Sequence, residues 1–402
     1  MTAEIVARPR RTRPKDRKQR ILETAAEMFE VNGYHDVAIS DIATAVGIVP
    51  SALYRHYRSK EEMLAAVLDA ALSSYEAILD AVTSWDELSA RMAEASLECG
   101  PFDLIWTRDR GHLSGREYDS VVERVRDISA RVAEIIGDTI PPHGIPADTI
   151  GWSVLAVMEW SRHRRLAVPV AEQVALLSAS ADALIRAGRS PHVKSTRLHK
   201  AAPPVVPDAG VGLLAALRRE ALLTTSITLF ATRGYPNVSL DDIGEVVGIA
   251  GPSVYNHFAN KLEILTCGLN RAFEVLWLDV SVVLRRHSDP SEALDELVAR
   301  HAQLVYDHWD LATVCLSHFR MLDEQTQCVL QRSFLDYLGE WQRLLVETRP
   351  DLTPEQAQSL VELAMAVNTG VVRVPGIRET ALPEYSAVLA RAVLGAPIRP
   401  SQ

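Results

Sequence analysis

The chain contains an internal repeat, and this repeat constrains its fold more than any other feature of the sequence. Residues 17–64 align without a gap on residues 218–265, with every position shifted by 201 and 17 identities among the 48 pairs. Many other pairs are conservative, such as Ile21 with Leu222. A repeat of this length indicates duplication, so the 402-residue chain consists of two halves that open with the same structural unit.

The repeated unit has the pattern of short helices joined by tight turns. In the first copy, residues 18–31 place their apolar side chains on one helical face. Residues 39–46 predict a second helix that ends at Gly47, and residues 50–57 predict a third. Ser59 and Glu62 have the spacing of a capping box that opens a long fourth helix. Two short helices that meet at a glycine turn and are braced by another helix are typical of the DNA-binding helix-turn-helix.

The residues of this unit resemble those of a known family. Residues 33–60 and 234–261 share Gly-Ile followed by Tyr-x-His-(Tyr/Phe)-x-x-Lys, and both strongly resemble the DNA-binding domain of the TetR family of bacterial regulators. Members usually carry one such domain on a chain half this length and act as homodimers. The sequence therefore resembles a tandem form, two fused regulators, similar in architecture to the actinobacterial regulators of mammalian-cell-entry lipid-import operons.

The resemblance implies which residues meet double-stranded DNA. The helices at 50–57 and 251–258, which we call the reading helices, would each enter a major groove. There, phosphate contacts set the register and short side chains approach the base edges. The predicted contacts lie on a basic arm, on the two reading helices and beside them: Arg10, Arg11, Arg13, Pro50, Ser51, Ala52, Tyr54, Arg55, His56, Arg58, Lys60, Ser239, Gly251, Pro252, Ser253, Tyr255, Asn256, His257 and Lys261. A structural alternative stands beside the paired residues: the tyrosines as core aromatics, the histidines as packing residues and the lysines as solvated charges.

The two copies differ where DNA would be touched. Arg55 and Arg58 of the first copy correspond to Asn256 and Ala259 of the second. At a salt slope of about −0.9 per phosphate contact, the first copy should bind DNA with the steeper salt dependence. Because unlike helices read unlike half-sites, the sequence predicts a non-palindromic operator with half-sites about one helical turn or a little more apart.

One departure from the family pattern concerns the start of the second short helix. In the second copy, Ser239 is placed to cap this helix, with Asp242 three residues later. The first copy has Ala38 at this position, so either Asp36 caps the helix or the contact is absent.

Charge and composition limit the class of protein. The net charge is −10, but the first twenty residues carry eight Arg or Lys against two acids, which predicts a basic arm. No apolar run is long enough to span a membrane, and the basic N-terminus lacks the apolar segment of a signal peptide. The four cysteines lack metal-ligand spacing, which fits reduced thiols. A cytoplasmic location without membrane contact is therefore expected.

The remaining sequence predicts an all-α protein, because helical periodicity recurs between Pro and Gly breakers and no alternating β pattern appears. The expected helices lie near 60–82, 85–99, 101–110, 115–138, 147–164 and 170–187, and near 261–286, 291–308, 310–322, 324–348, 354–373 and 380–394. By the resemblance, the last two helices of each half would pack together inside one chain as an intramolecular pseudo-dimer. Fusion removes the need for a homodimer without forbidding further self-association.

These patterns divide the chain into six parts. They are a basic arm (1–16), a first helix-turn-helix domain (17–64), a first helical regulatory domain (65–187), a Pro-rich linker (188–212), a second helix-turn-helix domain (213–265) and a second regulatory domain (266–396). The resemblance implies a small-molecule pocket in the regulatory domains, and a small apolar effector such as a lipid, sterol or acyl derivative is expected. The candidate lining residues, for which plain core packing is the alternative, are Trp106, Trp152, Trp160, Trp309, Phe319 and Trp341.

No catalytic motif was found in the sequence. The HExxH, GxSxG and P-loop patterns are absent, and the 12 His show no ligand spacing with Cys or Asp. We therefore expect no enzyme, no catalytic residue, no metal and no cofactor, and interpret the chain as a transcriptional repressor released by its effector. The alternative is a ligand-sensing or interaction protein in which one or both DNA-binding units no longer read DNA.

Overall fold

The computed structural model describes residues 14–82, 84–98, 102–137, 145–163, 166–188, 214–370 and 383–398. Within these ranges every regular element is a helix, so the predicted all-α fold is confirmed. Arg10, Arg11 and Arg13 lie outside the described residues, as do nearly all of the predicted arm and linker. No helix in the described ranges is long and apolar enough to cross a membrane.

The helices of the two halves follow the same order. The first half contains α1 (Pro14–Asn32), α2 (Ile39–Val46), α3 (Pro50–Leu53), α4 (Lys60–Ala81), α5 (Trp85–Glu98), α6 (Phe102–Asp109), the 3-10 turn η1 (Arg110–His112), α7 (Gly115–Gly137), α8 (Ala147–His163) and α9 (Val170–Gly188). The second half contains α10 (Leu214–Arg233), η2 (Tyr235–Asn237), α11 (Leu240–Val247), α12 (Gly251–Val254), α13 (Lys261–Arg286), α14 (Pro290–Asp307), α15 (Trp309–His318), η3 (Phe319–Met321), α16 (Glu324–Thr348), α17 (Pro354–Gly370) and α18 (Pro383–Leu394).

Each copy of the repeated unit turns at a glycine, as the sequence predicts. Gly47 and Gly248 end α2 and α11 with φ values of 75° and 78°, in the left-handed region that glycine enters at little cost. The following helices are shorter than expected: α3 and α12 end at Leu53 and Val254 instead of reaching 57 and 258. The chain tightens there, because the N–H of His56 donates to the carbonyl of Leu53 at 2.8 Å, a bond of 3-10 type.

Two predicted helices divide near their ends. The segments expected at 101–110 and 310–322 end their α-helical parts at Asp109 and His318 and continue as η1 and η3. Both tightened turns lie where the regulatory domains meet the helix-turn-helix domains, and α6 and α15 contact each other there. Tertiary contacts at this junction therefore set the helix ends.

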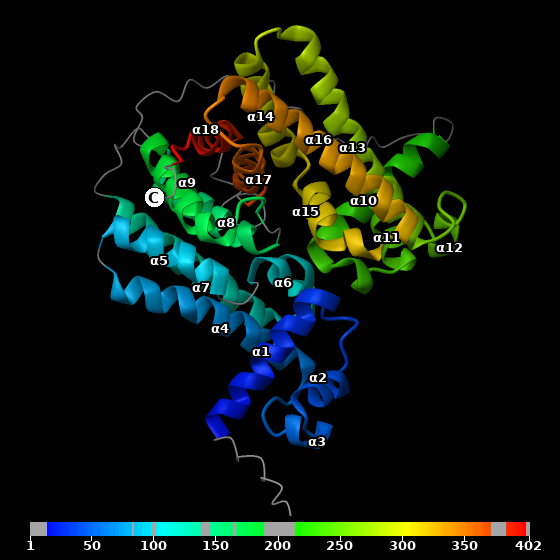
Figure 1. Cartoon of the computed structure of the whole chain (residues 1–402). Helices are drawn as coiled ribbons and strands as arrows, with labels where there is room; N and C mark the ends of the chain where they lie inside the picture. The colour runs from blue at the N-terminus through cyan, green and yellow to red at the C-terminus, as the bar shows by residue number, and fades with distance from the viewer. Residues whose placement is uncertain are drawn as a thin grey trace, which may run out of the picture.

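Four helices join the halves. Contacts connect α8, α9, α17 and α18 to one another, which confirms the predicted intramolecular pairing of the last two helices of each half. Most of α17 is buried, with Leu360, Val361 and Leu363 each fully buried. Figure 1 shows this bundle at the upper left, with the first helix-turn-helix unit (α1–α3) at the bottom and the second (α10–α12) at the right.

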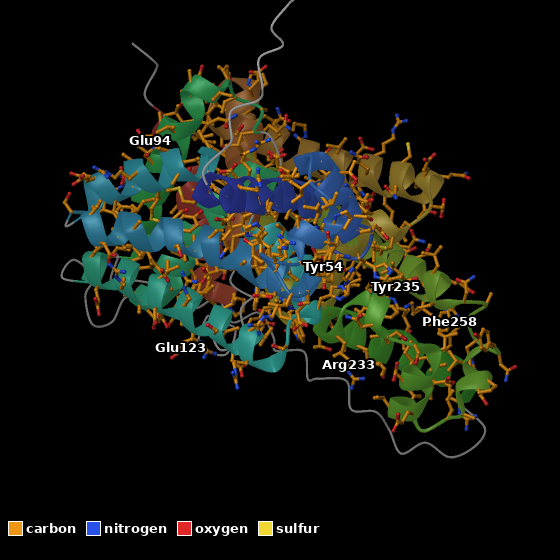
Figure 2. All side chains as sticks on the ribbon, turned by 90° about the horizontal axis from the view of Figure 1, so that it is seen from below. Tyr54, Glu94, Glu123, Arg233, Tyr235 and Phe258 are labelled. Atoms are coloured by element: carbon orange, nitrogen blue, oxygen red, sulfur yellow. The ribbon has the colours of Figure 1, made fainter. Side chains whose placement is uncertain are left out.

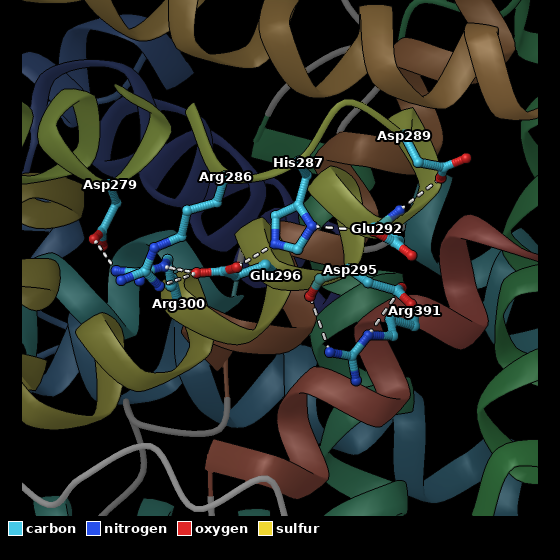
Figure 3. Close-up of polar contacts among 9 residues, drawn as sticks. All are labelled: Asp279, Arg286, His287, Asp289, Glu292, Asp295, Glu296, Arg300 and Arg391. Atoms are coloured by element: carbon cyan, nitrogen blue, oxygen red, sulfur yellow. Dashed lines mark hydrogen bonds and ion pairs between the residues drawn. The ribbon is translucent and has the colours of Figure 1, made fainter. Parts of the chain in front are cut away.

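A polar cluster fixes the corner between α13 and α14 (Figure 3). Arg300 forms ion pairs with Asp279 at 2.9 Å and with Glu296 at 2.7 Å. His287 lies between Glu296, at 2.5 Å, and Glu292, at 3.2 Å. These hydrogen bonds raise the pKa of His287, with that to Glu296 the largest cause.

Candidate nucleic-acid interface

The aromatic residues after the two reading helices lie on the surface. Tyr54 is 51% exposed and Tyr255 is 60% exposed, so neither is packed in a core. Their chain neighbours Tyr57 and Phe258 are buried instead, at 2% and 1% exposure, and anchor the turn from inside. Figure 2, which views the molecule from below, labels Tyr54 on the first unit and Phe258 on the second. Their exposure leaves Tyr54 and Tyr255 available for a DNA backbone, and the contact itself stays a prediction.

Most of the other predicted DNA-contact residues are accessible. Exposed residues include Pro50, Ser51, Arg55, Arg58, Ser239, Pro252 and Asn256. Partly buried residues are Ala52, His56, Gly251, Ser253 and His257. Most of the described candidates thus lie on or next to α3 in the first unit and α12 in the second.

The paired lysines have contacts that the sequence did not reveal. The Nζ of Lys261 donates to the carbonyl oxygens of Tyr235 at 2.8 Å, Val238 at 2.9 Å and Pro236 at 3.5 Å. The Nζ of Lys60 donates to the carbonyl of His35 at 3.2 Å. Burial lowers the pKa of both lysines. An ammonium has three protons, so a phosphate contact by Lys261 would have to replace one of these bonds.

Each lysine also lies over an aromatic ring. The Nζ of Lys60 is 4.2 Å from the ring centroid of Tyr34, and that of Lys261 is 4.4 Å from the ring of Tyr235. Within this structure the two lysines brace the turn before the second helix. Their predicted phosphate contact remains untested.

The starts of α2 and α11, the helices before α3 and α12, are bonded differently in the two copies. Ser239 Oγ accepts from the N–H of Asp242 at 3.1 Å, and Asp242 accepts from the N–H of Ser239 at 2.7 Å, which confirms the cap in the second copy. In the first copy Ala38 occupies the cap position, and Asp41 accepts its N–H at 3.0 Å. No side chain caps this helix start in the first copy, so Asp36 does not cap it and, of the two predicted alternatives, the absent contact is the one observed.

The long helices α4 and α13 start with matching caps. Ser59 Oγ accepts the N–H of Glu62 at 3.0 Å, and Asn260 accepts that of Glu263 at 2.8 Å. The Glu62 carboxylate reaches back to the N–H of Arg58 at 2.5 Å, one residue before the position that the capping-box pattern predicts. The same arrangement recurs in the second copy, where Glu263 accepts the N–H of Ala259 at 2.6 Å, so side chains bond the N–H groups at the start of both long helices.

The two surfaces differ in charge. Residues 33–60 carry three Arg or Lys and two Asp, whereas residues 234–261 carry one Lys, two Asp and one Glu. Asp241 replaces Ser40, and its carboxylate lies against Gly251, so close that a side chain on Gly251 would overlap it. Asp241 belongs to α11 and lies against the first residue of α12. The sequence analysis did not predict this acidic contact, although the 201-residue offset pairs Asp241 with a neutral serine.

A group of arginines, which we call the central clasp, connects both regulatory domains to both helix-turn-helix units. Arg108 donates to the carbonyl oxygens of Phe29 and Glu30 at the end of α1 and forms a buried ion pair with Asp109 at 2.9 Å. Asp109 in turn accepts the N–H of Tyr34 at 3.3 Å. Guanidinium groups at the C-terminal end of a helix are favourably placed in the field of its dipole.

The clasp also crosses between the halves. Arg110 Nη2 donates to the carbonyl of Ala231 at the end of α10, at 3.0 Å. From the second half, Arg320 donates to the carbonyl of Val31 at the end of α1. The clasp therefore consists of Arg108, Arg110 and Arg320.

A cavity of about 60 Å³ lies beside α6 in the first half. Its wall is mainly apolar and includes Phe102, Trp106, Trp152 and Trp160. Tyr75 donates to the carboxylate of Glu159, and the two residues form the polar part of this wall. Three of the candidate pocket residues thus meet around one cavity.

The other three candidates are not brought together. Trp341 is fully buried next to His301, with ring centroids 5.6 Å apart. Trp309 and Phe319 pack instead against the core of the second helix-turn-helix unit. Among the described residues, no group of His, Cys, Asp or Glu has the geometry of a metal site.

The fold and the paired surfaces define a helix-turn-helix protein that carries its reading unit twice. Residues 21–67 and 222–266 both match the model of the bacterial regulatory proteins of the tetR family. Each half of the chain therefore carries a DNA-binding domain of this family, in a tandem arrangement.

Relatives of known function match part of the chain. The transcriptional repressor KstR2 of Mycolicibacterium smegmatis is 36% identical over 91 residues, which are 22% of this chain and 44% of that protein. The transcriptional activator FasR of the same organism is 34% identical over 77 residues, 19% of this chain and 35% of that protein. The chain thus spans less than half the length of these curated relatives.

Solved structures match one half of the chain at a time. The ketosteroid transcriptional regulator KstR2 of Mycobacterium tuberculosis has a TM-score of 0.39 and 22% identity, covering 46% of this chain and 96% of that one. AibR, in complex with isovaleryl coenzyme A and operator DNA, has a TM-score of 0.35 and 20% identity, covering 42% of this chain and 96% of that one.

Proposed function

We propose that the protein is a transcriptional repressor that binds an asymmetric operator with its two helix-turn-helix units and leaves it when a small apolar effector binds. The observation that carries this proposal is the pair of unlike reading surfaces, each with an exposed tyrosine, in one folded chain. The six-part division from the basic arm to the second regulatory domain is retained within this proposal. The likeness to lipid-import operon regulators rests on the tandem architecture alone.

The central clasp supplies the link from effector to DNA. Trp106 lies in the cavity wall on α6, and two residues later on the same helix Arg108 holds the end of α1. Arg110 in the adjoining turn holds the end of α10. Movement of α6 by an effector would therefore displace both units, and a coupling of about 1–3 kcal/mol would weaken operator affinity roughly 5- to 150-fold.

Apolar effectors suit the mainly apolar cavity wall. One relative is a transcriptional activator, so activation is the second candidate function. In a transcription assay on the bound DNA, repression predicts lower transcript yield and activation predicts higher yield.

Selection from random duplex DNA, followed by native mass measurement of the complex, tests the proposal. We expect two dissimilar half-sites on one duplex bound by one chain. A palindrome bound by two chains would contradict the asymmetric operator. Absence of enrichment at low salt would favour a ligand-sensing protein whose reading units no longer bind DNA.

A further inference from the structure

The two helix-turn-helix units differ on the helix that precedes the reading helix. Asp241 and Glu245 are both exposed on α11 and stand four residues apart, so their carboxylates share one face of the helix. At the same positions of α2 the first unit has Ser40 and Thr44, and the hydroxyl of Thr44 donates to the carbonyl of Ser40 at 2.8 Å. The second unit therefore carries two negative charges on a face that is neutral in the first unit.

These charges adjoin the second reading helix. α11 contacts α12, and the carboxylate of Asp241 lies against Gly251, the first residue of α12. In a helix-turn-helix the first helix crosses the DNA backbone while the second enters the major groove. Carboxylates on this face of α11 would thus meet phosphates of the same charge, and each close pair weakens binding roughly fivefold in water.

The lysine that begins the long helix is also bonded differently in the two units. The Nζ of Lys261 has an acceptor for each of its three protons, namely the carbonyl oxygens of Tyr235, Pro236 and Val238. Among the described residues, the Nζ of Lys60 donates only to the carbonyl of His35. Lys60 can therefore bond a phosphate with its remaining protons, whereas Lys261 must first give up a carbonyl contact.

The second unit keeps the shape of a reading unit but lacks most of its charge. Tyr255 is 60% exposed, and the cap formed by Ser239 is intact. The exposed Arg55 and Arg58 of the first unit, however, have no charged counterpart in the second. Groups that neutralise phosphate supply nearly all of the affinity that does not depend on sequence. The second unit is therefore poorly equipped to hold DNA without help.

We infer that the two units are unequal: the first holds DNA by itself, and the second binds only while the first keeps it beside the duplex. Asp241 and Glu245 are the residues that set this order. The inference rests on the proposed function and goes beyond it, because an asymmetric operator does not by itself require unequal affinities. Attachment within one chain raises the local concentration of the second unit to about the millimolar range, so even a weak contact adds to the total affinity.

This order has a consequence for specificity. Phosphate contacts, which dominate the first unit, position the protein but carry no direct sequence information. A second unit with little positive charge adds affinity only where the base edges and the groove shape fit it. The second half-site therefore decides how long the chain stays on a given duplex.

Hydrogen exchange on the full chain measures which unit binds. A random-sequence duplex of about 12 base pairs is too short for two half-sites that are one helical turn apart. With this duplex at low salt, we expect slower amide exchange in α2 and α3 and unchanged exchange in α11 and α12. Equal protection of both units, or protection of α11 and α12 alone, would overturn the inference.

Exchange of residues between the copies gives matched variants. Asp241→Ser with Glu245→Thr should let the short duplex protect α11 and α12, with the affinity of this unit at least tenfold tighter. Thr44→Glu should weaken binding by the first unit roughly fivefold, and the neutral Thr44→Gln should leave it unchanged. The three positions are exposed, and the capping residues Ser239 and Asp242 stay in place. If α11 and α12 remain unprotected in the double variant, the assignment to these two acids is wrong.

A longer duplex that carries the selected operator separates the two proposals. Protection of both units by this duplex, with the first unit alone protected by the short one, would support both. If both units bind the short duplex equally and the operator holds two unlike half-sites, the unequal order fails and the proposed function stands. If the operator protects only α2 and α3, the two-unit operator fails and the inequality stands. Absence of protection by either duplex would refute both proposals.

Discussion

At the scale of single residues, three histidines show how position decides protonation. His301 and His318 are buried, and burial lowers the pKa of each to about 4. His301 Nδ1 lies 3.0 Å from the amide nitrogen of Asn368, and His318 Nε2 accepts the N–H of Tyr235. His287, by contrast, lies between two carboxylates that raise its pKa. The pH dependence of stability that comes from His301 and His318 should therefore be opposite in sign to that from His287.

The buried histidines predict that the free energy of unfolding already falls at pH values above those at which carboxylates titrate. Because the pKa of about 4 for His301 lies below its unfolded value, its contribution to stability is complete above about pH 6.5 and is lost as the pH falls toward 4. We expect a loss of about 2 kcal/mol at pH 5 for this residue, measured by urea unfolding. His301→Gln should flatten the profile, and equal slopes in parent and variant would contradict this origin.

The partly exposed cluster around His287 in Figure 3 predicts the reverse pH dependence of stability. Since the pKa of His287 is raised, its contribution is present below about pH 6.5 and is lost as the pH rises through the folded value. We expect His287→Gln to lower the thermal midpoint at pH 6 and to leave it nearly unchanged at pH 9. A constant difference across this range would indicate a packing role.

The charge difference between the two reading surfaces predicts that substitutions change the salt dependence of DNA affinity in a measurable way. Replacing Arg55 and Arg58 by the second copy's residues, Arg55→Asn with Arg58→Ala, should reduce the slope of log affinity against log salt by about 0.9 per lost phosphate contact. The matched variant Asn256→Arg with Ala259→Arg should increase it. Identical slopes for all three proteins on the selected duplex would show that these positions do not contact phosphate.

At the scale of elements, sequence reasoning is most accurate where the pattern is local. The hydrophobic period places the helices, and Gly47 and Gly248 are identifiable because only a left-handed residue makes that turn. The ends of α3 and α6 differ from expectation because the tightened turns depend on surrounding contacts. The carbonyl contacts of Lys261 are hidden for the same reason, since residues 23 to 26 positions earlier provide them.

The bond from Arg110 to the carbonyl of Ala231 predicts that a substitution in the first half loosens the end of α10 in the second half. Arg110→Met would leave the carbonyl of Ala231 without its guanidinium, at a cost of about 1–3 kcal/mol. We expect amides in the last turn of α10 to exchange hydrogen roughly 5- to 150-fold faster in the folded protein, with α1 nearly unchanged. Arg116→Met, at an exposed position on α7, is the control. Unchanged exchange in α10 would remove Arg110 from the coupling path.

At the scale of the whole molecule, the four-helix bundle decides how the halves meet. The sequence indicates which helices form it, but the contacts of Arg110 with α10 and Arg320 with α1 arise only once the halves associate, so no local pattern reveals them.

A close approach in the bundle gives a direct test of this pairing. A Cβ added at Gly370 would lie 2.3 Å from the Cβ of Ala156 on α8. Gly370→Ala should therefore destabilise the chain by about 1–3 kcal/mol, and Ala156→Gly in the same chain should relieve the overlap. A double-mutant cycle by chemical denaturation measures this interaction, and strictly additive effects would mean that α8 and α17 do not meet here.

Joining the bundle within one polypeptide has a consequence for gene control at low copy number. A regulator assembled from two separate chains loses its paired form on dilution, so its occupancy of DNA falls faster than in proportion to concentration. Here the partner is always attached, and the paired form persists when a cell holds only a few molecules. Under the proposed function, each helix-turn-helix unit could also change by mutation without altering the other, so that one half of the operator could diverge while the other half stays fixed.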